Sequence, residues 1–150
     1  MHLSSVTNLT ESTPDSARPA TLRAGVGISV VLPVRNEQQN LEELDRELRE
    51  TLTALGRKSE IIYADDHSTD NSPQILQRLL AAPQGQSIRT RVVTLRRNYG
   101  QTAALAAGID LAEGEIIILL DADGQNDPAD IPHLVEKLEQ GFDVVSGWRR

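Results

Sequence analysis

The stretch that decides the fold is Ile116-Ile-Ile-Leu-Leu120, followed at once by Asp121-Ala-Asp-Gly-Gln125. Five consecutive branched apolar residues, bounded by turn-forming residues, are typical of a β-strand. Because a parallel strand with helices on both faces has a continuous apolar run, we expect residues 116–120 to form a central strand buried on both faces. The abrupt change to polar residues predicts a carboxylate-bearing loop at the carboxyl end of this strand.

Outward from this strand, the chain alternates short strands with helices. Further β-rich runs occupy residues 28–32, 60–64, 91–95 and 142–145. Helical spacing of apolar or alanine residues marks 41–55, 101–111 and the segments that begin at Pro73 and Pro128. This repetition predicts an α/β fold with a mostly parallel, Rossmann-like sheet flanked by helices. We expect Gly108, inside the alanine-rich helix, to allow that helix close approach to the sheet.

Composition bounds the class of protein. The chain has 150 residues, 39% of them hydrophobic and 25% charged, which indicates a folded domain. The absence of cysteine excludes a disulfide scaffold, a thiolate zinc site and a cysteine nucleophile. A net charge of −7 and only 4 aromatic residues argue against a nucleic-acid partner. No apolar run approaches the roughly 18–20 residues that span a bilayer, so we expect a soluble, cytoplasmic domain.

The domain organisation follows from the same pattern. Residues 1–26 are rich in Ser, Thr, Ala and Pro and lack periodicity, so we predict a disordered N-terminal extension. Residues 27–150 carry all the predicted strands and helices and form one domain.

The loop after residues 116–120 carries the strongest chemical signal. In open α/β sheets, ligands bind outside the carboxyl ends of the strands. Asp121 and Asp123 can present hard oxygen ligands to Mg²⁺ or Mn²⁺, and Gln125 can add a neutral oxygen. The alternative is a structural turn, in which Asp127 caps the next helix; we expect Asp127 itself to be that cap.

Three other loops follow predicted strands. In the first, Asp65 or Asp66 can accept a hydrogen bond from a base N–H or a ribose hydroxyl. In the second, we expect Arg97 to be functional, since arginine binds diphosphates through paired hydrogen bonds, and Arg96 to be at the surface. The third is 33–37, which can also simply open the next helix. We expect a helix-capping role for Ser68, Thr69, Asp70 and Ser72.

Four motifs in order resemble the family 2 glycosyltransferases, in particular the branch of dolichol-phosphate mannosyltransferases and bacterial polyprenyl-phosphate glycosyltransferases. The motifs are Val30-Val-Leu-Pro-Val-Arg-Asn-Glu37, Asp65-Asp-His-Ser-Thr-Asp70, Arg97-Asn-Tyr-Gly-Gln-Thr-Ala-Ala104 and Leu120-Asp-Ala-Asp-Gly-Gln-Asn-Asp-Pro128. The resemblance covers about residues 28–150 and implies a GT-A nucleotide-sugar-binding fold. His67 stands where the family commonly has glycine, which predicts a stiffer loop.

The resemblance also implies roles for individual residues. It implies a metal site of Asp121, Asp123 and Gln125 that holds Mg²⁺ or Mn²⁺, and an acceptor-phosphate contact at Arg149 within Gly147-Trp-Arg149. It names no catalytic base. The residues that it places at the nucleotide are Pro33, Val34, Arg35, Glu37, Asp65, Asp66, Arg97, Asp121 and Ala122.

The implied activity is inverting, metal-dependent transfer of a sugar from a GDP- or UDP-linked donor to a polyprenyl phosphate. In the family the catalytic domain continues beyond the point that Arg150 matches, so we expect this chain to be the N-terminal, nucleotide-binding part. Membrane contact is then expected through regions absent from this chain, with the domain at the cytoplasmic face of the membrane.

Three alternatives share some or all of these motifs. A non-catalytic nucleotide-sugar-binding fragment shares all of them and lacks only the acceptor half. A haloacid-dehalogenase-like phosphatase also has Asp-x-Asp-Gly after an apolar strand, but it requires Thr where this chain has Gln125. A receiver domain requires a lysine after a later strand, and Lys137 lies inside a predicted helix instead.

Overall fold

The structure is a computed structural model and describes residues 26–147. Four parallel strands form one sheet in the order β3-β2-β1-β4. The strands are β1 (Ile28–Val34), β2 (Ser59–Asp65), β3 (Ile88–Thr94) and β4 (Ile116–Leu119). The helices are α1 (Leu41–Leu55), α2 (Ser72–Ala81), α3 (Gln101–Leu111) and α4 (Ile131–Glu139), the last preceded by the 3₁₀ turn η1 (Pro128–Asp130). The predicted α/β fold with a parallel sheet flanked by helices is therefore confirmed.

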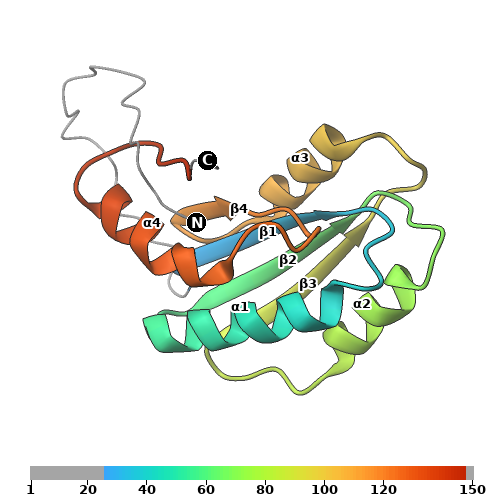
Figure 1. The fold of residues 1–150 in the computed structure, drawn as a ribbon, viewed down its shortest axis with the longest axis horizontal. Helices are drawn as coiled ribbons and strands as arrows, with labels where there is room; N and C mark the ends of the chain where they lie inside the picture. Colours follow the sequence, from blue (N-terminus) through green and yellow to red (C-terminus); the bar gives the residue numbers. More distant parts are fainter. Residues whose placement is uncertain (1–25, 148–150) are drawn as a thin grey trace.

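The helices cover the two faces of the sheet unequally (Figure 1). The helix α3 packs against β1 and β2 on one face, and α1 and α2 lie on the other with α4 beside α1. The α1 side holds the main hydrophobic core, which includes Val30, Leu32, Leu48, Ile61 and Tyr63, all fully buried. No helix in residues 26–147 is long and apolar enough to cross a membrane.

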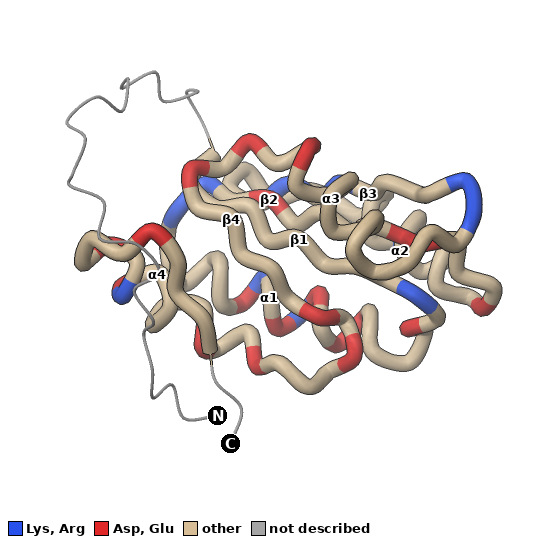
Figure 2. The backbone as a smooth tube through the Cα atoms, turned by 90° about the horizontal axis from the view of Figure 1, so that it is seen from above, with Lys and Arg blue, Asp and Glu red and all other residues tan. Residues whose placement is uncertain are grey.

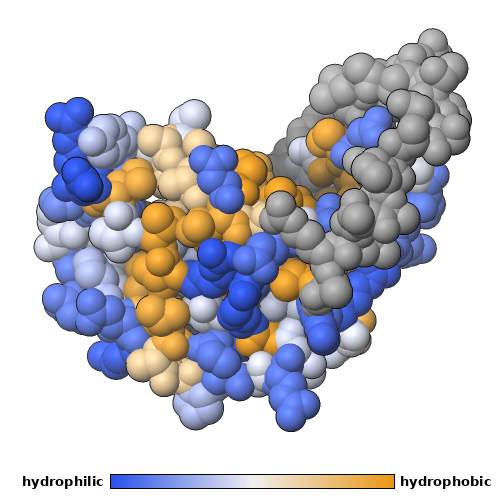
Figure 3. Space-filling view, turned by 180° about the vertical axis from the view of Figure 1, so that it is seen from behind, coloured by the Kyte–Doolittle hydropathy of each residue, from blue (hydrophilic) through white to orange (hydrophobic). Residues whose placement is uncertain are grey.

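Two strand predictions are wrong. The run 116–120 was expected to be central, but β4 is the last strand in the sheet order of the described residues, and Ile117 and Leu119 are 43% and 51% exposed. The reason is that α3 packs mainly on β1 and β2, so among the described residues one face of β4 lacks a helix. Figure 3 shows hydrophobic side chains reaching the surface on the side seen from behind. Residues 142–145 form no strand, because this segment pairs with no strand among the described residues; Val144 is 55% exposed.

Some predictions fall on residues outside 26–147. These are almost all of the predicted N-terminal extension and the acceptor-phosphate contact at Arg149.

The expected close approach of α3 to the sheet is confirmed. A Cβ atom at Gly108 would lie 2.4 Å from Cγ1 of Val31, which is fully buried on β1. The helix α3 ends at Leu111 with Ala112 as its C-cap, and a Cβ at Gly114, two residues further on, would lie 2.6 Å from the backbone nitrogen of Ser29. Both glycines therefore allow close packing onto β1.

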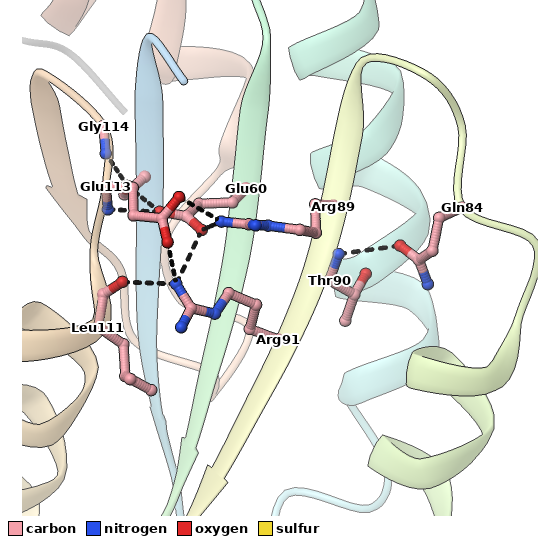
Figure 4. Close-up of polar contacts among 9 residues, drawn as sticks. Glu60, Gln84, Arg89, Thr90, Arg91, Leu111, Glu113 and Gly114 are labelled. Carbon is pink, nitrogen blue, oxygen red and sulfur yellow. Dashed lines mark hydrogen bonds and ion pairs between the residues drawn. The ribbon is translucent and has the colours of Figure 1, made fainter. Parts of the chain in front are cut away.

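A buried carboxylate on β2 forms hydrogen bonds and ion pairs with residues near the amino ends of β1 and β3 and in the α3–β4 connection (Figure 4). Glu60 on β2 is fully buried, and its carboxylate accepts hydrogen bonds from the Ser29 hydroxyl at 2.6 Å and the Glu113 N–H at 2.7 Å. Arg89 also pairs with Glu60 at 2.8 Å, and Arg91 lies 3.5 Å from the same oxygen. Burial by itself raises the pKa of Glu60, but these hydrogen bonds outweigh it and hold the pKa below its usual value.

Gly108→Ala is predicted to destabilise the fold by about 1–3 kcal/mol, because Val31 is stiff and buried and cannot move away from an added methyl group. Urea unfolding measures the change. In a Val31→Ala background the same substitution should be neutral or stabilising, since the space is then open and alanine favours the helix. Equal destabilisation in both backgrounds would contradict the packing explanation.

The Glu60 cluster predicts a pH dependence of stability. A carboxylate whose folded pKa is lowered stabilises the protein above its unfolded pKa of about 4.5, and that contribution is lost as the pH falls through the folded pKa. Unfolding measured between pH 6 and 3 should show a steeper loss of stability below about pH 4.5 for the wild type than for Glu60→Gln. Identical pH profiles would rule out this role for Glu60.

Candidate nucleotide-binding site

The candidate site lies at the carboxyl edge of the sheet, where the strand order reverses. The chain runs from β1 outward to β2 and β3, then crosses back to place β4 on the other side of β1. The carboxyl ends of β1 and β4 are therefore the topological switch point, where ligands bind in open α/β sheets. The loops that meet along this edge are 35–40, 66–71, 95–100 and 120–127.

The first two loops are bonded to each other as one unit. The Arg35 guanidinium donates through Nη1 to the carbonyl oxygens of Asp66, at 2.8 Å, and of His67. In return, Ser68 Oγ accepts the Asn36 N–H at 2.9 Å, and Asn36 Oδ1 accepts the Thr69 N–H at 2.8 Å. Arg35 therefore fixes the loop after β2, and its predicted contact with the nucleotide stays a prediction.

The next residues extend this unit to the starts of α1 and α2. The Glu37 N–H donates to Ser72 Oγ at 2.9 Å, and the Glu37 carboxylate accepts from Asn40 Nδ2 at 2.8 Å. Asp70 accepts the Ser72 N–H at 2.8 Å and the Gln38 N–H at 3.2 Å. Asp70 therefore bonds to the first turn of α2, as expected for a capping residue, whereas Ser68 and Ser72 bond across to the other loop.

Two residues of this unit have left-handed backbone conformations: Asn36 at φ 55° and His67 at φ 59°. Asparagine tolerates this region, but for histidine it is less favourable than for glycine. The observation gives a physical reason for the glycine that the family commonly has at the position of His67.

The adjacent carboxylates Asp65 and Asp66, both buried, have different surroundings. Asp66 accepts two backbone hydrogen bonds, from the Tyr99 N–H at 2.7 Å and from the Gly100 N–H at 2.8 Å. Asp65 Oδ1 accepts the Ser68 N–H at 3.1 Å, but Asp65 Oδ2 is buried with no hydrogen-bond partner. Burying a carboxylate oxygen without a hydrogen bond costs free energy. Asp65 Oδ2 is therefore the atom of this pair that is available to accept a hydrogen bond from a ligand.

The loop after β3 carries exposed side chains. The guanidinium carbon of Arg97 lies 4.7 Å from the centre of the Tyr99 ring, and both residues are exposed. At the end of this loop, Gln101 Nε2 donates to Asp121 Oδ1 at 2.9 Å. The loop therefore joins β2, through Asp66, to the carboxylate that follows β4.

The loop after β4 is acidic, with no lysine or arginine in the whole connection to α4 (Figure 2). Asp123 Oδ1 accepts the Gln125 N–H at 3.0 Å, and Asn40 Oδ1 lies 3.6 Å from the position of a Cβ at Gly124. Asp127 accepts the Ala129 N–H at 2.9 Å, so the expected cap is confirmed. The loop thus lies beside the start of α1.

The oxygen chemistry of this loop fits the expected divalent cation. The described residues hold no cluster of three acidic or histidine side chains that could bind a metal by themselves. Mg²⁺ typically binds one or two carboxylates and takes its other ligands from substrate phosphates and water. Asp121 and Asp123 match that requirement, and Gln125 stays a predicted third ligand.

The remaining predicted residues are less available to a ligand. The side chains of Val34 and Ala122 belong to the hydrophobic core, and Pro33 is half-buried. Arg96 is exposed, as expected. An open hollow of about 510 Å³ has no carboxylate in its lining, and its one charged residue already pairs with Glu42; it is lined by Gln38, Gln39, Asn71, Gln74, Ile75 and Arg78.

Residue-level prediction missed the hydrogen bonds that Tyr99, Gly100 and Gln101 donate to Asp66 and Asp121. Two of them act through backbone N–H groups, which no side-chain pattern reveals. For Gln101, the signal was its place directly after a glycine at the start of an alanine-rich helix.

The fold and the site together define an α/β domain with acidic and arginine-bearing loops at a topological switch point. The chain belongs to the family described as glycosyl transferase family 2, whose profile matches residues 29–150. This membership removes the phosphatase and receiver alternatives.

Among curated proteins, the chain is 45% identical over 132 residues to an undecaprenyl-phosphate 4-deoxy-4-formamido-L-arabinose transferase of Pseudomonas paraeruginosa (strain DSM 24068 / PA7). It is 46% identical over 132 residues to the protein of the same name in Pseudomonas syringae pv. syringae (strain B728a). Each match covers 82% of this chain and 38% of the relative, so the chain spans about two-fifths of these relatives' length.

Solved structures confirm the GT-A fold. Residues 1–349 of Staphylococcus aureus TarS superpose with a TM-score of 0.57 at 21% identity, over 77% of this chain and 33% of that one. The same protein in complex with UDP-GlcNAc superposes with a TM-score of 0.52 at 20% identity, over 77% of this chain and 32% of that one.

His67→Gly is predicted to raise the free energy of unfolding by about 1 kcal/mol, because glycine adopts φ 59° without the steric cost that histidine incurs. Asn36→Gly, at a nearly equal φ, should instead lower stability, because it removes the acceptor of the Thr69 N–H. Chemical denaturation of the two variants tests both signs. Stabilisation by Asn36→Gly would contradict the assigned hydrogen bond.

Proposed function

We propose that this chain is the nucleotide-binding part of a glycosyltransferase that moves a sugar from a nucleoside diphosphate sugar to a polyprenyl phosphate. Membership of glycosyl transferase family 2 supports the transferase class. The name of the Pseudomonas relatives, which specifies undecaprenyl phosphate, supports a lipid-phosphate acceptor. Because a polyprenyl-phosphate acceptor lies in a membrane, we further propose that the domain acts at the cytoplasmic face of that membrane.

The observation that carries the nucleotide assignment is the unpaired oxygen of Asp65. Its Oδ2 atom is buried at the carboxyl end of β2, next to the switch point, and no group of the described residues donates to it. A base N–H or a ribose hydroxyl would supply the missing donor and offset the cost of burying this oxygen.

The other end of the donor, its diphosphate, would lie toward Asp121 and Asp123. A bound Mg²⁺ or Mn²⁺ neutralises the charge that develops on the leaving diphosphate. Asp121 and Asp123 would hold that ion, and Arg97 would add a second positive charge on the other side.

The acceptor supplies its own nucleophile. An oxygen of the lipid phosphate forms the new bond to the anomeric carbon, and the bond from that carbon to the diphosphate oxygen breaks with its electron pair. Because the phosphate is already an anion, no strong general base is needed, and a single displacement inverts the anomeric configuration. Arg149 is the proposed contact for the acceptor phosphate.

A second candidate function is nucleotide-sugar binding without transfer. The observation behind it is that the described residues form only the proposed donor side of the site, since the proposed acceptor contact Arg149 lies outside them. The two functions share the nucleotide site and differ only in turnover, which an assay with undecaprenyl phosphate and a nucleotide-sugar donor separates.

Calorimetric titration with UDP and with GDP, each with and without Mn²⁺, tests the site. We expect one of the two nucleotides to bind, to bind more tightly with Mn²⁺, and to lose the metal effect in Asp123→Ala. Asp65→Asn should weaken nucleotide binding roughly 10–100-fold, the equivalent of one hydrogen bond to a charged group.

Asp110→Asn is the matched control for the Asp65 variant, since Asp110 is exposed on α3, ten residues after Gly100. It should bind nucleotide as the wild type does. Failure of both nucleotides to bind in the presence of Mn²⁺ would overturn the proposed function, and wild-type affinity in Asp65→Asn would overturn the role of Asp65.

A further inference from the structure

We infer that Gln101 is a positioning residue that holds the carboxylate of Asp121 in the orientation needed for the metal–diphosphate complex. This inference rests on the proposed function. Gln101 is not among the residues predicted to bind the metal or the nucleotide.

The geometry joins two loops that are distant in sequence. Gln101 is the first residue of α3, and its Nε2 donates to Asp121 Oδ1 at 2.9 Å. Among the described residues, this is the hydrogen bond that the Asp121 side chain accepts. Gln101 therefore restrains the rotation of the first carboxylate of the Asp-x-Asp sequence.

Gln101 can do this because the backbone directly before it is held in place. The preceding N–H groups, of Tyr99 and Gly100, are both bonded to the buried carboxylate of Asp66. The Gly100 carbonyl accepts the Ala104 N–H at 3.2 Å, which begins the α3 hydrogen-bond ladder. Gly100 itself has φ 98°, a conformation that glycine adopts readily. The Gln101 side chain therefore extends from a fixed backbone, and its hydrogen bond orients the Asp121 carboxylate before a ligand binds.

The chemistry of glutamine suits this position. A neutral amide donates to Asp121 Oδ1 without cancelling the negative charge, so Oδ2 remains an anionic ligand for a cation. A lysine or arginine at position 101 would compete with that cation for Asp121. The segment around Asp121, residues 110–130, also contains no lysine or arginine. Partners that orient metal-binding carboxylates are a general feature of metal sites, and their loss typically lowers metal affinity about 10–100-fold.

The test compares Gln101→Ala with the wild type in nucleotide titrations, using whichever of UDP and GDP binds the wild type. Each protein is titrated with Mn²⁺ and again with EDTA. We expect the affinity in EDTA to equal that of the wild type, while the gain in affinity on adding Mn²⁺ falls about 10-fold or more. A merely structural role would lower both affinities together.

Gln77→Ala is the matched control, because Gln77 is an exposed glutamine on α2, away from Asp121. Its metal effect should equal that of the wild type, and Asp121→Asn should abolish the effect. A wild-type metal effect in Gln101→Ala, or an equal loss in Gln77→Ala, overturns this inference and leaves the proposed function intact. Absence of any metal effect in the wild type overturns both this inference and the metal dependence of the proposed function.

Discussion

The two hydrogen bonds that Asp66 accepts from the Tyr99 and Gly100 N–H groups are the interaction on which the candidate site depends. Each is a bond between a backbone donor and a buried charged acceptor, a class that contributes about 1.5–3 kcal/mol. Together they hold the loop after β3 against the end of β2. Through that loop they also place Gln101 beside Asp121, so the carboxyl ends of β2, β3 and β4 form one connected surface.

The sheet order explains why these loops meet. Because β4 lies beside β1 while β3 lies two strands away on the other side, the loops after β3 and β4 come together only across the edge of the sheet. Arg35 donates to the Asp66 carbonyl oxygen and Asn36 Oδ1 accepts the Thr69 N–H, and these hydrogen bonds join the loops after β1 and β2 along the same edge. At the opposite edge, the buried Glu60 accepts the Ser29 hydroxyl and the Glu113 N–H, so both oxygens of its carboxylate are paired once Arg89 is included.

Much of the fold could be predicted from local sequence. The bounds of α1 and α3, the cap at Asp127 and the close approach at Gly108 follow from apolar spacing, capping preference and residue size. These features depend on neighbours along the chain or on a single packing contact.

The errors concern properties that depend on distant partners. An apolar run such as 116–120 reports the propensity to form a strand, but its exposure depends on whether a helix covers both faces, and α3 covers β1 and β2 instead. Residues 142–145 have β-type composition, yet a strand also needs a neighbour to pair with. In the same way, Asp65 and Asp66 are equivalent in sequence, and only the fold brings the N–H groups of the β3–α3 loop to one of them.

The division of roles between these two carboxylates is the central claim, and a crystal structure of the chain with its nucleotide and Mn²⁺ tests it most directly. The account predicts a nucleotide nitrogen or hydroxyl within about 3 Å of Asp65 Oδ2, with Asp66 still bonded to the Tyr99 and Gly100 N–H groups. A nucleotide bound through Asp66, with the β3–α3 loop released and Asp65 Oδ2 still unpaired, would contradict it.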